Sequence, residues 1–216
     1  VVTSQPVETV TLLKPTPAAV QLRRSGTDLP SRAADNLYWL GRLAERAEFM
    51  VRHLRSVIAR LTSDVAPVSM MEVARLLETI SEFNEWRADP ELGDDDLVDA
   101  IRAEAVALIF DENRSAGLAP TLNSLRRTAT AVRDRLSIDS WRVVNQLNPA
   151  TLFPWKSADI RPGEMLVLLN QMINLLLTYS GLATESMTRG QGWRFLDMGR
   201  RIERANQTLR LVRQMF

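Results

Sequence analysis

The chain has 216 residues, 45% of them apolar, and its 27 basic and 26 acidic side chains leave a net charge of +1. An apolar fraction of this size is enough to bury a core, which excludes a disordered or collagen-like chain. The near-neutral charge excludes an overall field that attracts nucleic acid, and the lack of cysteine excludes a disulfide framework.

The apolar stretches of the chain are short. Residues 165–169 and 175–177 are followed or preceded within a few positions by Asn, Gln or Glu, whereas a membrane span needs about 18 apolar residues. The amino terminus lacks the basic, apolar and small-residue order of a signal peptide. We therefore expect a cytoplasmic protein whose partners include no membrane and no nucleic acid. With one histidine and no cysteine, we also expect no metal and no cofactor.

Residues 1–29 differ in pattern from the rest of the chain. A weak strand-like alternation is interrupted by Pro15 and Pro17. This pattern predicts an extended arm or linker, because proline is excluded from the interior of a sheet. A lone strand cannot satisfy its own backbone, so the arm would need a partner outside it.

From Ser31 onward, apolar residues recur at helical spacing. The spacing predicts a first helix from about Ser31 to about Leu61. A second helix is predicted after Pro67, where Ser69 and Glu72 form a capping box. A third begins at the three aspartates of residues 94–96, because acidic side chains suit the positive end of a helix dipole.

The second half of the chain continues this helical pattern. A fourth helix carries an apolar stripe over residues 118–136, and a fifth begins at Ser137 and ends before Pro149. The loop that follows contains Phe153, Pro154 and Trp155, which we expect to pack against the fold. A sixth helix begins at Pro162. A seventh carries a stripe formed by Phe195, Met198, Ile202, Ala205, Leu209, Val212 and Phe216. The sequence therefore predicts an all-α bundle of about seven helices.

The first and seventh helices contain the same motif. Residues 40–47 read Leu-Gly-Arg-Leu-Ala-Glu-Arg-Ala, and residues 198–205 read Met-Gly-Arg-Arg-Ile-Glu-Arg-Ala, at a constant offset of 158 residues. The apolar stripes of the two helices share this offset. Glycine is unfavourable inside a helix, so its presence at the same place in both copies indicates a duplicated helix. The two copies are expected to pack about a pseudo-two-fold axis.

The charged residues of the motif allow two interpretations. Glu45 and Arg46 are adjacent, so they point in different directions and cannot pair with each other. In the structural interpretation, Glu45 pairs with Arg204 and Glu203 pairs with Arg46, because a buried charge without a partner is costly. In the functional interpretation, four arginines clamp a carboxylate or phosphate and the glutamates orient them. These are Arg42, Arg46, Arg200 and Arg204.

The repeated motif resembles that of the Alpha-E family, bacterial helical domains named for a Glu-Arg motif. Residues 38–48 resemble the opening signature of this family. Three further stretches agree in the family's order, at residues 110–113, 133–145 and 185–195. Arg114 and Asn206 depart from the proline and the aspartate that are usual at these positions, which weakens the case for binding at either place.

The resemblance implies a function and a domain organisation. Family members are fused to, or encoded beside, a circularly permuted ATP-grasp module in what resembles an amide-bond synthesis system. The chain would then be an interaction and positioning domain for an ATP-grasp amide ligase, fused or separate. Residues 1–29 resemble the tail of such a module, and residues 30–216 the helical domain, truncated at its carboxyl end. A homo-oligomer is also possible.

Two other functions remain open at this stage. One is a module that binds a small molecule or peptide through the Arg/Glu cluster. The other is an enzyme of peptide or amide-bond metabolism, which would need Glu45 or Glu203 in a pocket with a raised pKa, alongside Asp111. No catalytic residue is assigned. The candidate binding residues are Arg42, Glu45, Arg46, Asp111, Asn113, Arg189, Trp193, Arg200, Glu203 and Arg204.

Overall fold

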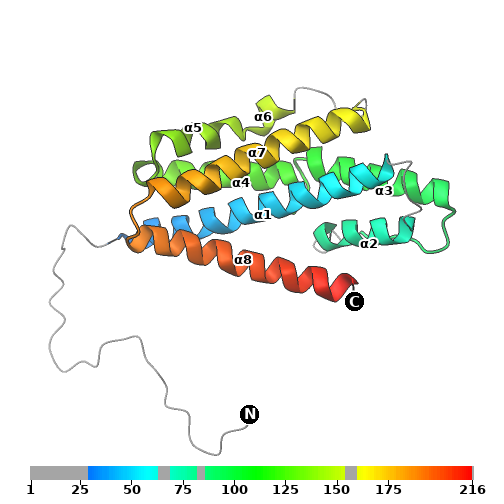
Figure 1. The fold of residues 1–216 in the computed structure, drawn as a ribbon, viewed down its shortest axis with the longest axis horizontal. Helices are drawn as coiled ribbons and strands as arrows, with labels where there is room; N and C mark the ends of the chain where they lie inside the picture. The colour runs from blue at the N-terminus through cyan, green and yellow to red at the C-terminus, as the bar shows by residue number, and fades with distance from the viewer. Residues whose placement is uncertain (1–28, 63–68, 82–85, 154–159, 216) are drawn as a thin grey trace, which may run out of the picture.

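The described residues form an all-α bundle (Figure 1). The computed structural model describes residues 29–62, 69–81, 86–153 and 160–215, so the arm expected at residues 1–28 lies outside the described part. The helices are α1 (Ser31–Leu61), α2 (Met70–Ser81), α3 (Asp94–Phe110), α4 (Leu118–Ala131), α5 (Ile138–Gln146), α6 (Pro149–Leu152), α7 (Pro162–Ser186) and α8 (Gln191–Met215), with a short 3₁₀ turn at Arg133–Arg135.

Local sequence signals set several of the helix starts. α1 begins at Ser31 and α7 begins at Pro162, as predicted. The Ser137 side chain accepts a hydrogen bond from the Ser140 backbone N–H and caps α5. The additional helix is α6, which Asn148 caps within the segment predicted as a loop. Phe153 packs edge-on against Phe110, with the ring centroids 5.0 Å apart, whereas Pro154 and Trp155 lie outside the described residues.

α1 is the central helix of the bundle. It packs against α4 and α7 on one side and against α8 on another (Figure 1). Its predicted apolar stripe is buried from Leu37 to Ile58, and Leu61 at the end of the stripe is half-buried against the core, which confirms the prediction for this helix. The buried stripe consists of Leu37, Leu40, Ala44, Ala47, Val51, Leu54 and Ile58.

α7 is long and apolar enough to cross a membrane, judged by length and composition alone. In the bundle it packs against α1 and α5 and contributes Met165, Leu169, Met172 and Tyr179 to the core. This packing accounts for its apolar face, because a helix that borders two neighbours must bury side chains on more than one side. The expected lack of a membrane partner and the expected cytoplasmic location both stay predictions.

The prediction for α8 is wrong about which face is buried. Its buried residues are Leu196, Gly199, Glu203 and Gln207, and these point toward α1. At 100° per residue, the predicted apolar stripe is centred roughly 130° around the helix axis from these buried residues. Most of that stripe is exposed, at Met198, Ile202, Ala205, Leu209 and Val212. Phe195 is half-buried, and Phe216 lies outside the described residues.

Candidate functional site

The two motif glycines bring α1 and α8 into direct backbone contact. A Cβ atom at Gly41 would lie 2.1 Å from the Leu196 carbonyl oxygen, and one at Gly199 would lie 2.1 Å from the Tyr38 carbonyl oxygen. Residues 38 and 196 are themselves related by the offset of 158, so the crossing has the expected pseudo-two-fold symmetry. Because no side chain fits here, the glycines decide which faces of the two helices meet.

Glu203 is buried at this crossing and accepts hydrogen bonds from two arginines of α1. Arg46 binds it through both carboxylate oxygens, with Nε to Oε1 at 2.7 Å and Nη2 to Oε2 at 3.1 Å. Arg42 donates from Nε to Oε2 at 2.7 Å, and Gln207 donates to Oε1 at 3.3 Å. Each carboxylate oxygen therefore has two donors, so the charge is fully satisfied within the fold.

Glu45 occupies the symmetric position on α1. It receives Arg204 through both oxygens, at 2.6 and 3.0 Å, while Arg200 approaches to 3.7 Å. The crossed pairing of Glu45 with Arg204 and of Glu203 with Arg46 is thus confirmed. The two halves differ in exposure, because the Arg204 side chain is 63% exposed and the Arg46 side chain is 31% exposed.

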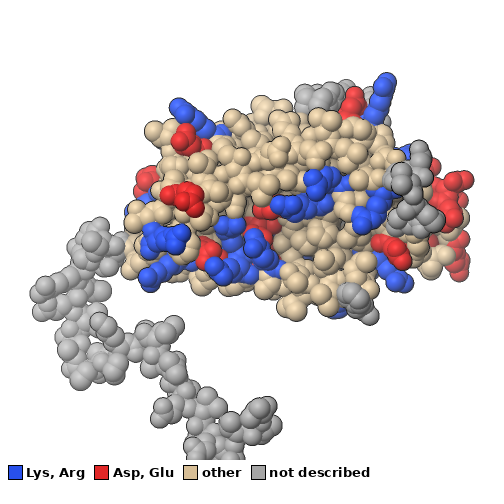
Figure 2. Space-filling view, in the orientation of Figure 1, with Lys and Arg blue, Asp and Glu red and all other residues tan. Residues whose placement is uncertain are grey.

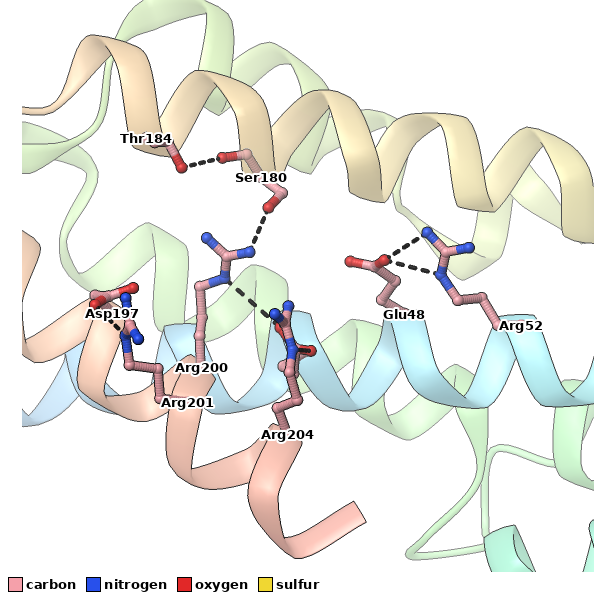
Figure 3. Close-up of polar contacts among 9 residues, drawn as sticks. Glu48, Arg52, Ser180, Thr184, Asp197, Arg200, Arg201 and Arg204 are labelled. Carbon is pink, nitrogen blue, oxygen red and sulfur yellow. Dashed lines mark hydrogen bonds and ion pairs between the residues drawn. The ribbon is translucent and has the colours of Figure 1, made fainter. Parts of the chain in front are cut away.

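The second pair of arginines departs from the symmetry. The Arg200 Nη2 atom donates to the Ser180 hydroxyl on α7 at 2.6 Å, and Figure 3 shows Arg200 reaching from α8 toward α7. Arg42 instead stacks over Trp39, with its Cζ atom 5.1 Å from the ring centroid. All four arginines of the proposed clamp therefore have partners in the protein. Figure 2 shows basic and acidic side chains gathered where α8 passes α1.

The electrostatics of Glu203 favour the charged form. Burial alone would raise its pKa, but the hydrogen bonds and charges of Arg46 and Arg42 outweigh burial and hold the pKa below its usual value. The hydrogen bond from Arg204 to Glu45 raises the pKa of the Arg204 guanidinium in the same way. A general acid at neutral pH needs a raised carboxyl pKa, so the lowered pKa of Glu203 does not suit it to that role.

Asp111 and Asn113 lie outside the ionic cluster, in the connection between α3 and α4. Both side chains are exposed, and the Asp111 carboxylate accepts the Asn113 backbone N–H at 2.9 Å. The role of this motif in the structure is to shape the loop. Arg114, which replaces the usual proline, pairs with the buried Glu104 at 2.8 Å.

Arg189 and Trp193 lie at the amino end of α8. The Arg189 guanidinium stacks over the Trp193 ring at 5.5 Å, a contact of the cation–π type. Arg189 lies two residues before α8 begins, and Trp193 lies in its first turn, five residues before the motif begins at Met198. The candidate residues therefore divide into three groups, and the structure joins only the six charged motif residues into one cluster.

A cavity of about 240 Å³ borders this cluster on the side of α2. Four of its wall residues follow no pattern that predicts a site, because they come from α2 and from the loop after α3. The offset of 158 relates a further wall residue, Arg210 of α8, to Arg52 of α1. The cavity is lined by Arg46, Phe49, Met50, Thr79, Ile80, Ser115, Ala116, Glu203, Gln207 and Arg210.

We expect the stability of the fold to decrease as the pH falls below 6.5 because of His53. Its Nδ1–H donates to the Phe49 carbonyl at 2.9 Å, and burial lowers its pKa below 6.5 despite that hydrogen bond. Between the lowered pKa of His53 in the folded chain and its ordinary value of 6.5 in the unfolded chain, the unfolded chain binds more protons, so acid favours unfolding. His53→Gln should remove this part of the slope in urea unfolding at pH 7 and pH 5. An unchanged slope would contradict the burial of the neutral ring.

The comparisons with known proteins agree with this architecture. A family model, Alpha-E, described as a predicted alpha-helical domain with a conserved ER motif, matches residues 29–216. Uncharacterised proteins of Mycobacterium bovis and of two Mycobacterium tuberculosis strains are 31% identical over 186 residues, which cover 80% of this chain and 21% of each relative. The chain therefore spans about a fifth of the length of these relatives. No solved structure is significantly similar.

The family match covers all of the described helices, and both copies of the Glu-Arg motif lie at the contact between α1 and α8. The chain belongs to the Alpha-E family.

Proposed function

We propose that the chain is a helical interaction and positioning domain that docks a partner through the apolar face of α8. One observation carries this proposal. The four large side chains Met198, Ile202, Leu209 and Val212 are 39–68% exposed on a single helix face. Their counterparts at an offset of 158 residues are all buried in α1, at Leu40, Ala44, Val51 and Leu54. Contiguous exposed apolar residues of this kind mark interaction sites.

The symmetry of the motif helices suggests what covers this face. In α1, the corresponding stripe is covered by α4 and α7, two helices that present apolar residues. The α8 face has the same residue spacing, so an apolar helical surface of the partner fits it. A groove of about 600 Å³ extends the face toward the start of α1, between Tyr38, Phe195 and Ile202.

Charged side chains lie along the edges of the apolar face of α8. Asp197 and the exposed Arg201 form an ion pair at 2.7 Å beside it, and Arg204 lies one turn further along (Figure 3). Polar side chains around an apolar centre are typical of protein interfaces. The family resemblance supports a helical surface of a circularly permuted ATP-grasp amide ligase as the partner, with this domain positioning it.

We expect Leu209→Glu to weaken binding of a purified circularly permuted ATP-grasp protein, the proposed partner, by tenfold or more, because a carboxylate would be buried at the centre of the contact. Isothermal titration calorimetry measures the affinity. The stability of the variant should change by about 0.5 kcal/mol or less, since Leu209 is 68% exposed.

Val167→Glu is the matched control, because Val167 is 69% exposed on α7, away from this face. It should bind as the unmodified chain does. Equal affinity for both variants would refute α8 as the docking face. Sedimentation showing that the chain alone forms a dimer that Leu209→Glu dissociates would instead assign the face to a second copy, and would also overturn the proposal.

A further inference from the structure

An open depression of about 440 Å³ lies along α4, on a part of the surface that includes neither the Glu-Arg cluster nor the docking face of α8. All of its described lining residues except Glu112 belong to α4, and Glu112 comes from the connection between α3 and α4. Among the described lining residues, Pro120 alone is apolar. The depression is therefore a polar site, in which charge and hydrogen bonding decide what binds.

Arg126 is a half-buried cation in the wall of this depression. Its Nη1 atom donates to the Asn148 side-chain oxygen at 2.8 Å, which holds the guanidinium beside α6. Its Nε atom is buried without an acceptor, and the side chain forms no ion pair with any described residue. The half-buried Arg46 and Arg114, in contrast, each pair with a buried glutamate. Because a charge removed from water is costly without a counter-charge, an anion bound in the depression would stabilise Arg126.

Arg127 brings a second positive charge to the same wall. Its side chain is exposed, its Nη2 atom donates to the Ser124 hydroxyl at 3.0 Å, and within the described helices and loops it pairs with no carboxylate. Two adjacent cations repel each other, and an anion between them removes this repulsion. The planar N–H donors of arginine match the two oxygens of a carboxylate. The α4 wall is therefore suited to bind a carboxylate.

Glu112 provides the opposite charge at the edge formed by the loop. The Asp111 carboxylate accepts the Asn113 backbone N–H at 2.9 Å, so the loop turns at Glu112. The Glu112 side chain is exposed, and it forms no hydrogen bond or ion pair with the residues that the structure describes. A carboxylate at this edge attracts an ammonium group and repels a phosphate. The depression thus has a cationic wall and an anionic edge.

We propose that this depression binds a zwitterion, namely a short peptide of small residues with both ends free. Arg126 and Arg127 bind the terminal carboxylate, and Glu112 binds the terminal ammonium group. The volume is that of about 15 waters at roughly 30 Å³ each, which exceeds a single amino acid and accommodates a dipeptide. Large apolar side chains would find little apolar surface to bury there. This site is separate from the docking face of α8 and does not depend on it.

The probe for the test is alanylalanine. It is compared with alanylalanine amide, which lacks the carboxylate, and with N-acetyl-alanylalanine, which lacks the ammonium group. Binding to the full chain is followed by NMR chemical-shift perturbation, with an expected dissociation constant on the order of 1 mM. The amide should bind about tenfold more weakly, because it loses the charged contact with both arginines. The N-acetyl form should bind about threefold more weakly, because Glu112 is exposed and an exposed ion pair contributes less.

Two variants test the two ends of the site separately. Arg127→Gln should weaken alanylalanine binding by about fivefold and leave binding of the amide unchanged, since only the carboxylate contacts Arg127. Glu112→Gln should weaken alanylalanine binding by about threefold and leave binding of the N-acetyl form unchanged. Both side chains are exposed, so neither variant should alter the free energy of unfolding appreciably. Arg142→Gln is the matched control, because Arg142 is 71% exposed on α5 and does not line the depression.

The proposal also predicts where alanylalanine binds, because the perturbed backbone resonances should include Asn123 and Thr130. Perturbations confined to α8 would refute the depression as the site. Equal affinity for alanylalanine and its amide would exclude the role of the arginines, and equal affinity for the N-acetyl form would exclude that of Glu112. Inorganic phosphate binding as tightly as alanylalanine would indicate a simple anion site, and no binding at all would refute the site directly.

Discussion

Gly41→Ala is expected to destabilise the fold by about 3 kcal/mol, an unusually large effect for the addition of one methyl group. The new Cβ atom would lie 2.1 Å from the Leu196 carbonyl oxygen, which is backbone and cannot move aside alone. α1 and α8 would have to separate, and this would also lengthen the hydrogen bonds of Glu45 and Glu203. Urea unfolding of the full chain measures the change.

The same substitution at Gly181 is the control. Gly181 lies in the interior of α7, and nothing lies within 4 Å of a Cβ atom added there. Because alanine is a better helix former, Gly181→Ala should stabilise the fold by about 0.5–1 kcal/mol. Gly199→Ala should behave like Gly41→Ala, and the double variant should cost less than the sum of the two, since one separation relieves both contacts. A neutral Gly41→Ala variant would refute the close crossing.

Glu203→Gln is expected to destabilise the fold by about 3 kcal/mol, because it leaves two arginines of α1 without their carboxylate. Glu45→Gln should cost less, about 1–2 kcal/mol, because its main partner Arg204 is 63% exposed and water can replace the lost contact. Urea unfolding at pH 7 measures both changes. The informative result is which variant loses more stability. A larger loss of stability for Glu45→Gln than for Glu203→Gln would contradict the greater exposure of Arg204.

The pH dependence provides an independent check on Glu203. Its pKa is held below the usual 4.5 in the folded chain. The ion pairs therefore contribute fully above pH 4.5 and are lost as the pH falls through the lowered folded value. Glu203→Gln should flatten the acid limb of the stability curve. An unaltered acid limb would show that the carboxylate is not stabilised by Arg42 and Arg46.

These two sets of variants also distinguish the two interpretations of the Glu-Arg motif. If the motif is structural, Glu203→Gln lowers the free energy of unfolding. If the motif served mainly to bind a carboxylate or phosphate, Glu203→Gln would leave the free energy of unfolding unchanged. The saturated hydrogen bonding of Glu203 favours the structural role.

The sequence by itself determined every described helix except α6, and it determined the pairing of the motif. Helix bounds follow from local signals, such as the spacing of apolar residues in α1 and the proline that begins α7. The crossed ion pairs could be predicted because adjacent Glu and Arg residues cannot satisfy each other, and because the repeat supplied a matching partner at an offset of 158 residues.

Only the tertiary structure decided the orientation of α8 and the walls of the cavity. An apolar stripe predicts burial but not which neighbour buries it. At this crossing the close contact of the glycines requires the face of α8 with Gly199 and Glu203 to meet α1, which leaves the apolar stripe exposed. The cavity depends on α2 and on Ser115 and Ala116, which approach α8 through contacts distant in sequence. Such contacts leave no periodic pattern, because they depend on how helices pack rather than on local spacing.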